Sequence, residues 1–67
     1  MSDENLKLKK RIEHWIQHNN EHSSRFEKEA ENAEYMNLKQ VAMALRAAAA
    51  LSKKVSQELR VAEENII

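Results

Sequence analysis

Apolar residues recur every three or four positions along most of the chain, in two separate series. The first series comprises Leu8, Ile12, Trp15, Ile16, Phe26, Ala30 and Ala33, and the second comprises Val41, Ala44, Ala48, Leu51, Val55, Leu59, Ala62 and Ile66. Such spacing is typical of one face of an α-helix. The chain also lacks Gly and Pro and is rich in good helix formers. The pattern predicts an all-α protein with helices over about residues 4–35 and about residues 38–65.

The join between the two series predicts a turn at about residues 35–37. Asn37 suits the N-cap of the second helix, and Gln40 stands three residues later, as in a capping box. Asn also tolerates the left-handed conformation that ends a preceding helix. Both roles of Asn37 are compatible with the sequence.

The distribution of charge predicts an antiparallel hairpin. Residues 19–36 carry two basic and five acidic side chains, whereas residues 37–54 carry four basic and none acidic. Residues 1–18 have a net charge of +1 and residues 55–67 a net charge of −2. Folding back at the turn pairs segments of opposite sign, and the summed pattern favours that orientation although each surface pair is weak.

The second helix carries more apolar positions than one partner helix can cover. A further stripe comprises Leu38, Ala42, Leu45, Ala49, Ser52 and Leu59, with Ile16 on the matching flank of the first helix. An apolar stripe too wide for one partner indicates another. We therefore expect a homodimer in which two hairpins form an antiparallel four-helix bundle through this stripe. The alternative is a monomer whose Ala-rich run reflects helix propensity alone.

Composition removes several classes of function. Sixty-seven residues without Cys form one small domain, residues 1–67, with no disulfide and no thiolate metal site. Equal numbers of acidic and basic residues give no bias toward nucleic acid, and we interpret the cluster from Lys7 to Arg11 as a solvated face. We expect no signal peptide, no membrane span and a cytoplasmic location. Without Cys, Gly-rich loops or a Ser-His-Asp arrangement, no catalytic residues are expected and the chain is not expected to be an enzyme.

Three histidines stand four residues apart, at His14, His18 and His22. On a helix, two such imidazoles can chelate one transition-metal ion, and imidazole suits nickel or zinc. His14 and His22 are ~12 Å apart along the helix axis, so all three cannot share an ion. We therefore predict a metal site at His18 with one neighbour, with Glu21 and Glu58 as the nearest carboxylates.

An architectural role for these histidines is the competing interpretation. Asn19 and His22 interrupt an otherwise apolar stripe, and buried polar groups need hydrogen-bond partners. Ser52 and Ser56 stand at the corresponding level of the second helix. On this view the polar residues fix the register of the helices, as buried polar groups do in other helical bundles.

The run HWIQHNNEHSSRF (residues 14–26) and the Ala/Glu-rich stretch after it resemble a family of small helical-hairpin domains with a His-Trp-Ile-x-His-Asn-x-x-His signature. The resemblance covers roughly residues 8–65 and implies the hairpin fold. Some of these hairpins are attached to CooT-type nickel-binding proteins, which implies that His14, His18 and His22 bind metal. This chain has no His-rich tract before the hairpin, which weakens a role in metal storage, and it has Asn37 where Gly is expected at the turn.

Together these observations predict a small, non-enzymatic, self-associating helical module with a divalent transition metal at His18 and either His14 or His22. The alternative is a purely structural or adaptor bundle that binds another protein helix and whose histidines are architectural.

Overall fold

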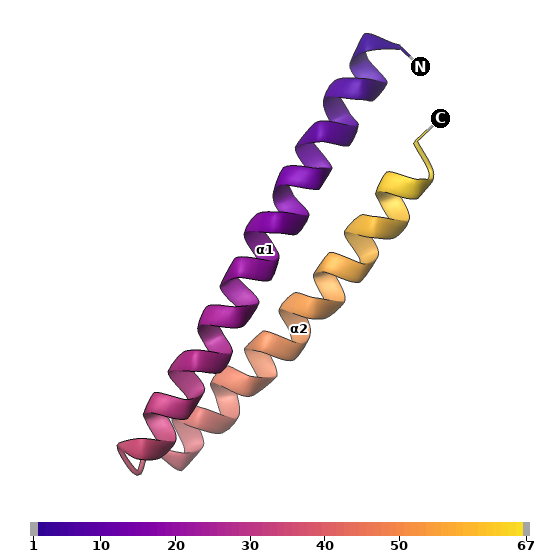
Figure 1. The fold of residues 1–67 in the computed structure, drawn as a ribbon. Coiled ribbons are helices and arrows are strands. Elements are labelled where there is room, and N and C mark those ends of the chain that lie inside the picture. Colours follow the sequence, from indigo (N-terminus) through magenta and orange to yellow (C-terminus); the bar gives the residue numbers. More distant parts are fainter. Residues whose placement is uncertain (1, 67) are drawn as a thin grey trace.

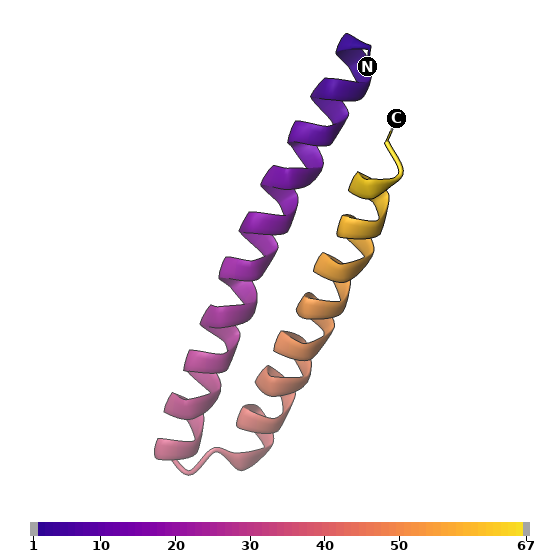
Figure 2. The same cartoon turned by 45° about the vertical axis from the view of Figure 1, so that its right-hand side comes forward.

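The computed structural model describes residues 2–66, which form two long α-helices, α1 (Asp3–Tyr35) and α2 (Lys39–Glu64). The helices lie side by side and run in opposite directions, so that the two chain ends share one end of the molecule (Figure 1; Figure 2). The hairpin measures 52 × 14 × 10 Å. Its radius of gyration is 15.6 Å, against about 11 Å for a compact domain of this length. The predicted all-α hairpin is confirmed.

The start of α1 is fixed by Ser2, whose side-chain oxygen accepts a hydrogen bond from the Asn5 backbone N–H at 3.1 Å. This bond satisfies one of the N–H groups that have no partner within the first turn. Asp3 and Glu4 follow in that turn, where the helix dipole favours negative charge.

Asn37 ends α1 and does not cap α2. Its φ angle is +66°, in the left-handed region. The N–H of Leu38 bonds to the Ala33 carbonyl at 2.8 Å and the N–H of Asn37 to the Glu34 carbonyl at 2.9 Å, the pattern of a Schellman motif. The N-cap of α2 is Leu38, without a side-chain hydrogen bond. The capping box predicted for Asn37 and Gln40 is therefore wrong, because the left-handed residue lies one position too early to cap α2.

The core between the helices is made mostly of small side chains. The buried residues are Ile12, Ser23, Ala30, Ala33, Ala42, Ala49 and Ser56. Seven residues separate Ser23 from Ala30, Ala42 from Ala49 and Ala49 from Ser56, which is the repeat of a coiled-coil seam. The Ser23 hydroxyl reaches across to the Ala49 backbone carbonyl at 3.1 Å. Small residues thus allow the two backbones to approach closely.

This core corrects the predicted dimer interface. Ala42 and Ala49, assigned from the sequence to contact a second copy, are 0% and 2% exposed within one chain. Leu45, Ser52, Leu59 and Ile16 are half-buried, and Leu38 is exposed beside the turn. The stripe of small residues therefore packs on α1, because close packing of two helices favours Ala and Ser over larger side chains. Val41, Leu51 and Val55, which belong to the second apolar series, are exposed.

Two ion pairs join the helices across one side of the hairpin. Arg46 donates to Glu34 at 2.8 Å, and Lys53 donates to Glu27 at 2.6 Å. Both pairs link the acidic second half of α1 to the basic first half of α2, as the charge distribution predicts. All four side chains are well exposed, so the pairs contribute little stability individually and act mainly on register.

Neither helix within residues 2–66 combines the length and the apolar character that a membrane crossing needs.

Candidate functional site

The two sides of the helix seam differ in chemistry. On one side, here called the polar face, lie the pairs Glu34–Arg46 and Glu27–Lys53 and a hydrogen bond of 2.6 Å from the Ser56 hydroxyl to the Asn20 side-chain oxygen. These α1 residues are spaced by seven, so they share one flank of the helix. The opposite flank carries several of the large side chains that the core leaves out.

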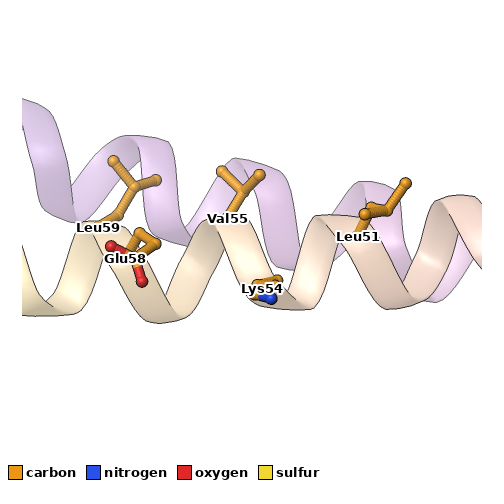
Figure 3. A pocket seen from close by; sticks show the side chains of 5 residues that line it. All are labelled: Leu51, Lys54, Val55, Glu58 and Leu59. Carbon is orange, nitrogen blue, oxygen red and sulfur yellow. The ribbon is translucent and has the colours of Figure 1, made fainter.

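That opposite side, here called the apolar face, consists of six side chains around two shallow hollows: Trp15, His18 and His22 from α1, and Leu51, Val55 and Leu59 from α2. One hollow, of about 290 Å³, lies between the helices and is lined by all of these except Leu51. Figure 3 shows the other, of about 460 Å³: Leu51, Val55 and Leu59 point to the same side of α2, with Lys54 and Glu58 below them. Trp15 of α1 and Val55 and Leu59 of α2 therefore line the same hollow.

Much of the apolar face is open to solvent. Trp15 is 46% exposed, Val55 50% and Leu51 65%. Steps of seven residues extend the face along α1 to Leu8 and along α2 to Ala48 and Val41. Exposed apolar side chains of both helices therefore gather on this side of the hairpin.

Asn19 also lines the hollow between the two helices. Its side-chain amide donates to the Ser56 hydroxyl at 2.9 Å and to the backbone carbonyl of Ser52. The sequence predicted that Asn19 would find partners at Ser52 and Ser56, and both are confirmed, with the Ser52 carbonyl in place of its hydroxyl. Among the described residues, every buried side-chain polar atom has a hydrogen-bond partner.

The three histidines form a continuous row along α1. The rings of His14 and His18 are stacked with their centroids 6.0 Å apart, and those of His18 and His22 meet edge to face at 4.7 Å. His22 also stacks on Phe26 at 6.0 Å. His22 is half-buried, whereas His18 and His14 are exposed. The closest pair, His18 and His22, is also the pair that lines the hollow.

The predicted carboxylate ligands do not join this row. Within residues 2–66, no three side chains of His, Asp or Glu are grouped closely enough to hold one metal ion. Glu21 and Glu58 therefore do not complete a three-ligand site with the histidines of the same chain. Within a single hairpin, the neighbouring imidazoles are therefore the pairs His14–His18 and His18–His22.

Two carboxyl groups have shifted pKa values. The hydrogen bond and positive charge of Arg46 lower the pKa of Glu34 below its ordinary value. The pKa of Glu63 is raised, first by partial desolvation and then by the hydrogen bond and negative charge of Glu13. Both groups lie away from the apolar face, so the row of histidines is not flanked by either.

The apolar face was missed because the surface for a second copy was assigned to the stripe that contains Ala42 and Ala49. The spacing of the charged residues could have shown which side of each helix faces away from the apolar face. Glu27 and Glu34 stand seven apart on α1, and Arg46 and Lys53 stand seven apart on α2. In an antiparallel pair, such residues face each other across one side of the seam. Placing them together turns Val41, Ala48 and Val55 to the other side, and in the structure Val55 lines both hollows there.

A family model described as a domain of unknown function, DUF8180, matches residues 8–66. No curated protein and no solved structure matches the chain. The matched range includes the apolar face, all three histidines and nearly all of both helices. This small helical hairpin therefore belongs to the DUF8180 family.

Proposed function

We propose that this chain is a non-enzymatic helical module that works by self-association, in which the apolar face packs on the same face of a second copy to form a four-helix bundle. The observation that supports it is the exposure of Trp15 on α1 and of Leu51 and Val55 on α2, beside a core of small side chains. The proposal keeps the bundle expected from the sequence and moves its interface to the apolar face.

The accessible surface supports a missing partner. The hairpin exposes 5464 Å². A compact monomer of 7.8 kDa exposes about 4,400 Å². The excess is on the order of 1,000 Å², similar to the roughly 800 Å² that each partner buries in a standard protein interface. A second copy that covers the apolar face would therefore bring each chain to the exposure of a compact protein.

The small side chains of the core also support a missing partner. Ile12 is the one large apolar side chain that the described residues bury, and the other buried apolar residues are Ala. Hydrophobic stabilisation is about 25 cal/mol per Å² of apolar surface removed from water, so alanines contribute little. Chains of this size without disulfides usually gain stability from metals or oligomers. A second copy supplies the missing burial with no other component.

Two valines of α2 provide a matched test. Val55 is 50% exposed on the apolar face, and Val61 is 53% exposed but lies about 180° around the helix from the core. Sedimentation equilibrium should give a dimer for the wild type and for Val61→Glu, and a monomer for Val55→Glu. A wild type that stays monomeric at tens of micromolar, both with zinc and with chelator, would overturn the proposal, and a Val55→Glu variant that stays dimeric would exclude this face. A monomeric wild type that binds an amphipathic helix through Val55 would favour the adaptor function instead.

A second candidate function is binding of a divalent transition metal, and the 4.7 Å contact between the rings of His18 and His22 favours it. Two imidazoles one turn apart can chelate one ion. The resemblance to hairpins found with CooT-type nickel-binding proteins supports nickel, and the ligand type equally suits zinc. Calorimetric titration of metal-free protein with each ion tests it: saturable micromolar binding should be lost in His18→Ala. Absence of binding by the wild type would leave the histidines with an architectural role.

A further inference from the structure

We infer that His18 and His22 form half of a transition-metal site that the same two residues of a second copy complete, giving four imidazoles around one ion. The inference rests on the proposed self-association through the apolar face. It identifies where the two copies are joined and in which orientation.

One chain supplies too few ligands for a closed site. Zinc in structural sites is held by four protein ligands in tetrahedral geometry. His18 and His22 provide two adjacent imidazoles, and no three His, Asp or Glu side chains of residues 2–66 are grouped around one point. The two missing ligands must come from another molecule. A symmetric partner brings the same pair.

The His18–His22 pair stands near the middle of the hairpin. Asn19 is the midpoint of α1, and its side chain bonds to the backbone of Ser52, which lies at the midpoint of α2. His18 and His22 are both within one turn of Asn19. Two hairpins stacked face to face in opposite directions overlap most fully when the two-fold axis crosses them at mid-length. The axis then passes through the hollow that His18 and His22 line.

Charge on α1 fits this axis. Arg11 and Glu29 are eighteen residues apart, which is about five full turns, so they lie on one line along the helix. That line passes between His18 and His22. A two-fold axis at residue 20 places Arg11 opposite Glu29 of a second copy and His18 opposite His22 of a second copy.

The other symmetric arrangement does not build the site. A two-fold axis parallel to the helices packs α1 against α2 of a second copy. His18 and His22 then face the level of Leu51 and Val55, which carry no metal ligand. Four imidazoles therefore require α1 to pack against α1, and the metal content reports the orientation of the dimer.

The test uses the full chain with zinc alone as the probe and the His14→Ala variant as the control. His14 belongs to the same histidine row but does not line the hollow. Wild type and His14→Ala should bind one zinc per two chains, and zinc should tighten the dimer at least tenfold in sedimentation equilibrium. His18→Ala and His22→Ala should each weaken zinc binding at least tenfold. Cobalt(II) in place of zinc should give the intense visible absorption of a tetrahedral site.

The outcomes separate this inference from the proposed self-association. A dimer that forms equally with zinc and with chelator, and binds no zinc or one per chain, overturns the shared site and leaves self-association standing. A monomer in chelator that becomes a dimer with one zinc per two chains supports the shared site and makes assembly metal-dependent. A protein that is monomeric in both conditions overturns both.

Discussion

The side-chain amide of Asn19 donates a hydrogen bond of 2.9 Å to the hydroxyl of Ser56, across the seam between the two helices. The same hydroxyl donates a hydrogen bond of 2.6 Å to the side-chain oxygen of Asn20, so three polar side chains are linked at mid-length. In a seam that is lined mostly by small side chains, such a cluster is satisfied in one register only. These polar contacts therefore help to fix the register of α1 against α2.

Replacing Asn19 should weaken the hairpin. Asn19→Ala removes the bonds to Ser56 and to the Ser52 carbonyl, and we expect the free energy of unfolding to fall by about 1–2 kcal/mol. Asn32→Ala is the control, because Asn32 is exposed and bonds only within α1, at 3.4 Å to Glu29. Urea denaturation at one fixed protein concentration measures both. Equal stabilities of the two variants would show that the cross-seam bonds do not contribute.

Enlarging a small core residue should be costly. Ala49 is 2% exposed and lies against the Ser23 hydroxyl, so Ala49→Leu forces the helices apart and should lower stability by about 1–3 kcal/mol. Ala50→Leu, on the exposed side of the same turn, should change it by less than about 0.5 kcal/mol. Thermal unfolding measures both. A harmless Ala49→Leu would mean that the small-residue stripe is not the seam of the hairpin, contrary to the structure.

The two helices, the antiparallel orientation and the partners of Asn19 could be predicted from the sequence, because helical periodicity, charge and hydrogen-bond demand are local properties. The assignment of stripes could not be made from hydrophobicity alone. Val55 and Leu51 are more hydrophobic than Ala49 and Ser52, yet the smaller residues form the seam. Close approach of backbones is a tertiary effect that favours small side chains, whereas residue-by-residue hydrophobicity favours large ones.

The candidate site could likewise be predicted from the sequence only in part. Spacing alone places His18 and His22 on neighbouring turns, and the structure shows their rings in contact. Glu58 could act as a ligand only if α2 turned that side chain toward the histidines. The stripe of α2 that packs on α1 is not the one expected, and this changes the direction of the Glu58 side chain. The double role considered for Asn37 was settled by its φ angle, because a residue in the left-handed region ends one helix and leaves the N-cap of the next to Leu38.

The stability of the hairpin should depend on pH through Glu63. Its pKa is raised by desolvation and by Glu13, so the folded chain binds a proton on Glu63 more tightly than the unfolded chain does. That stabilisation is present below the ordinary pKa of about 4.5 and is lost as the pH rises through the raised value. Glu63→Gln should therefore be more stable than the wild type at pH 7, with the difference shrinking toward pH 4. Chemical denaturation of the two proteins at several pH values measures this difference.

The turn should accept Gly and resist Ala. At a φ of +66°, Asn37 occupies a conformation that Gly adopts freely and that a β-carbon makes unfavourable. We expect Asn37→Gly to raise the melting temperature and Asn37→Ala to lower stability by about 1 kcal/mol. Asn32→Gly, inside α1, should instead lower stability by about 1 kcal/mol. A destabilising Asn37→Gly would contradict the Schellman motif at this turn.

Exchanging two charges on α1 should reveal how the copies are oriented. With α1 packed against α1 of a second copy about residue 20, Arg11 faces Glu29 of a second copy twice in each dimer. Arg11→Glu and Glu29→Arg each place like charges together and should weaken the dimer several-fold at low salt, because rim charges contribute modestly and are screened. The double variant Arg11→Glu with Glu29→Arg restores opposite charges and should return the dissociation constant close to that of the wild type. The same exchange between Lys28 and Glu21, for which this axis provides no such pairing, is the control. Sedimentation equilibrium at two salt concentrations measures all of these variants. If the double variant is no tighter than either single one, α1 does not face α1, and the four-imidazole site loses its geometric basis even if the chain dimerises.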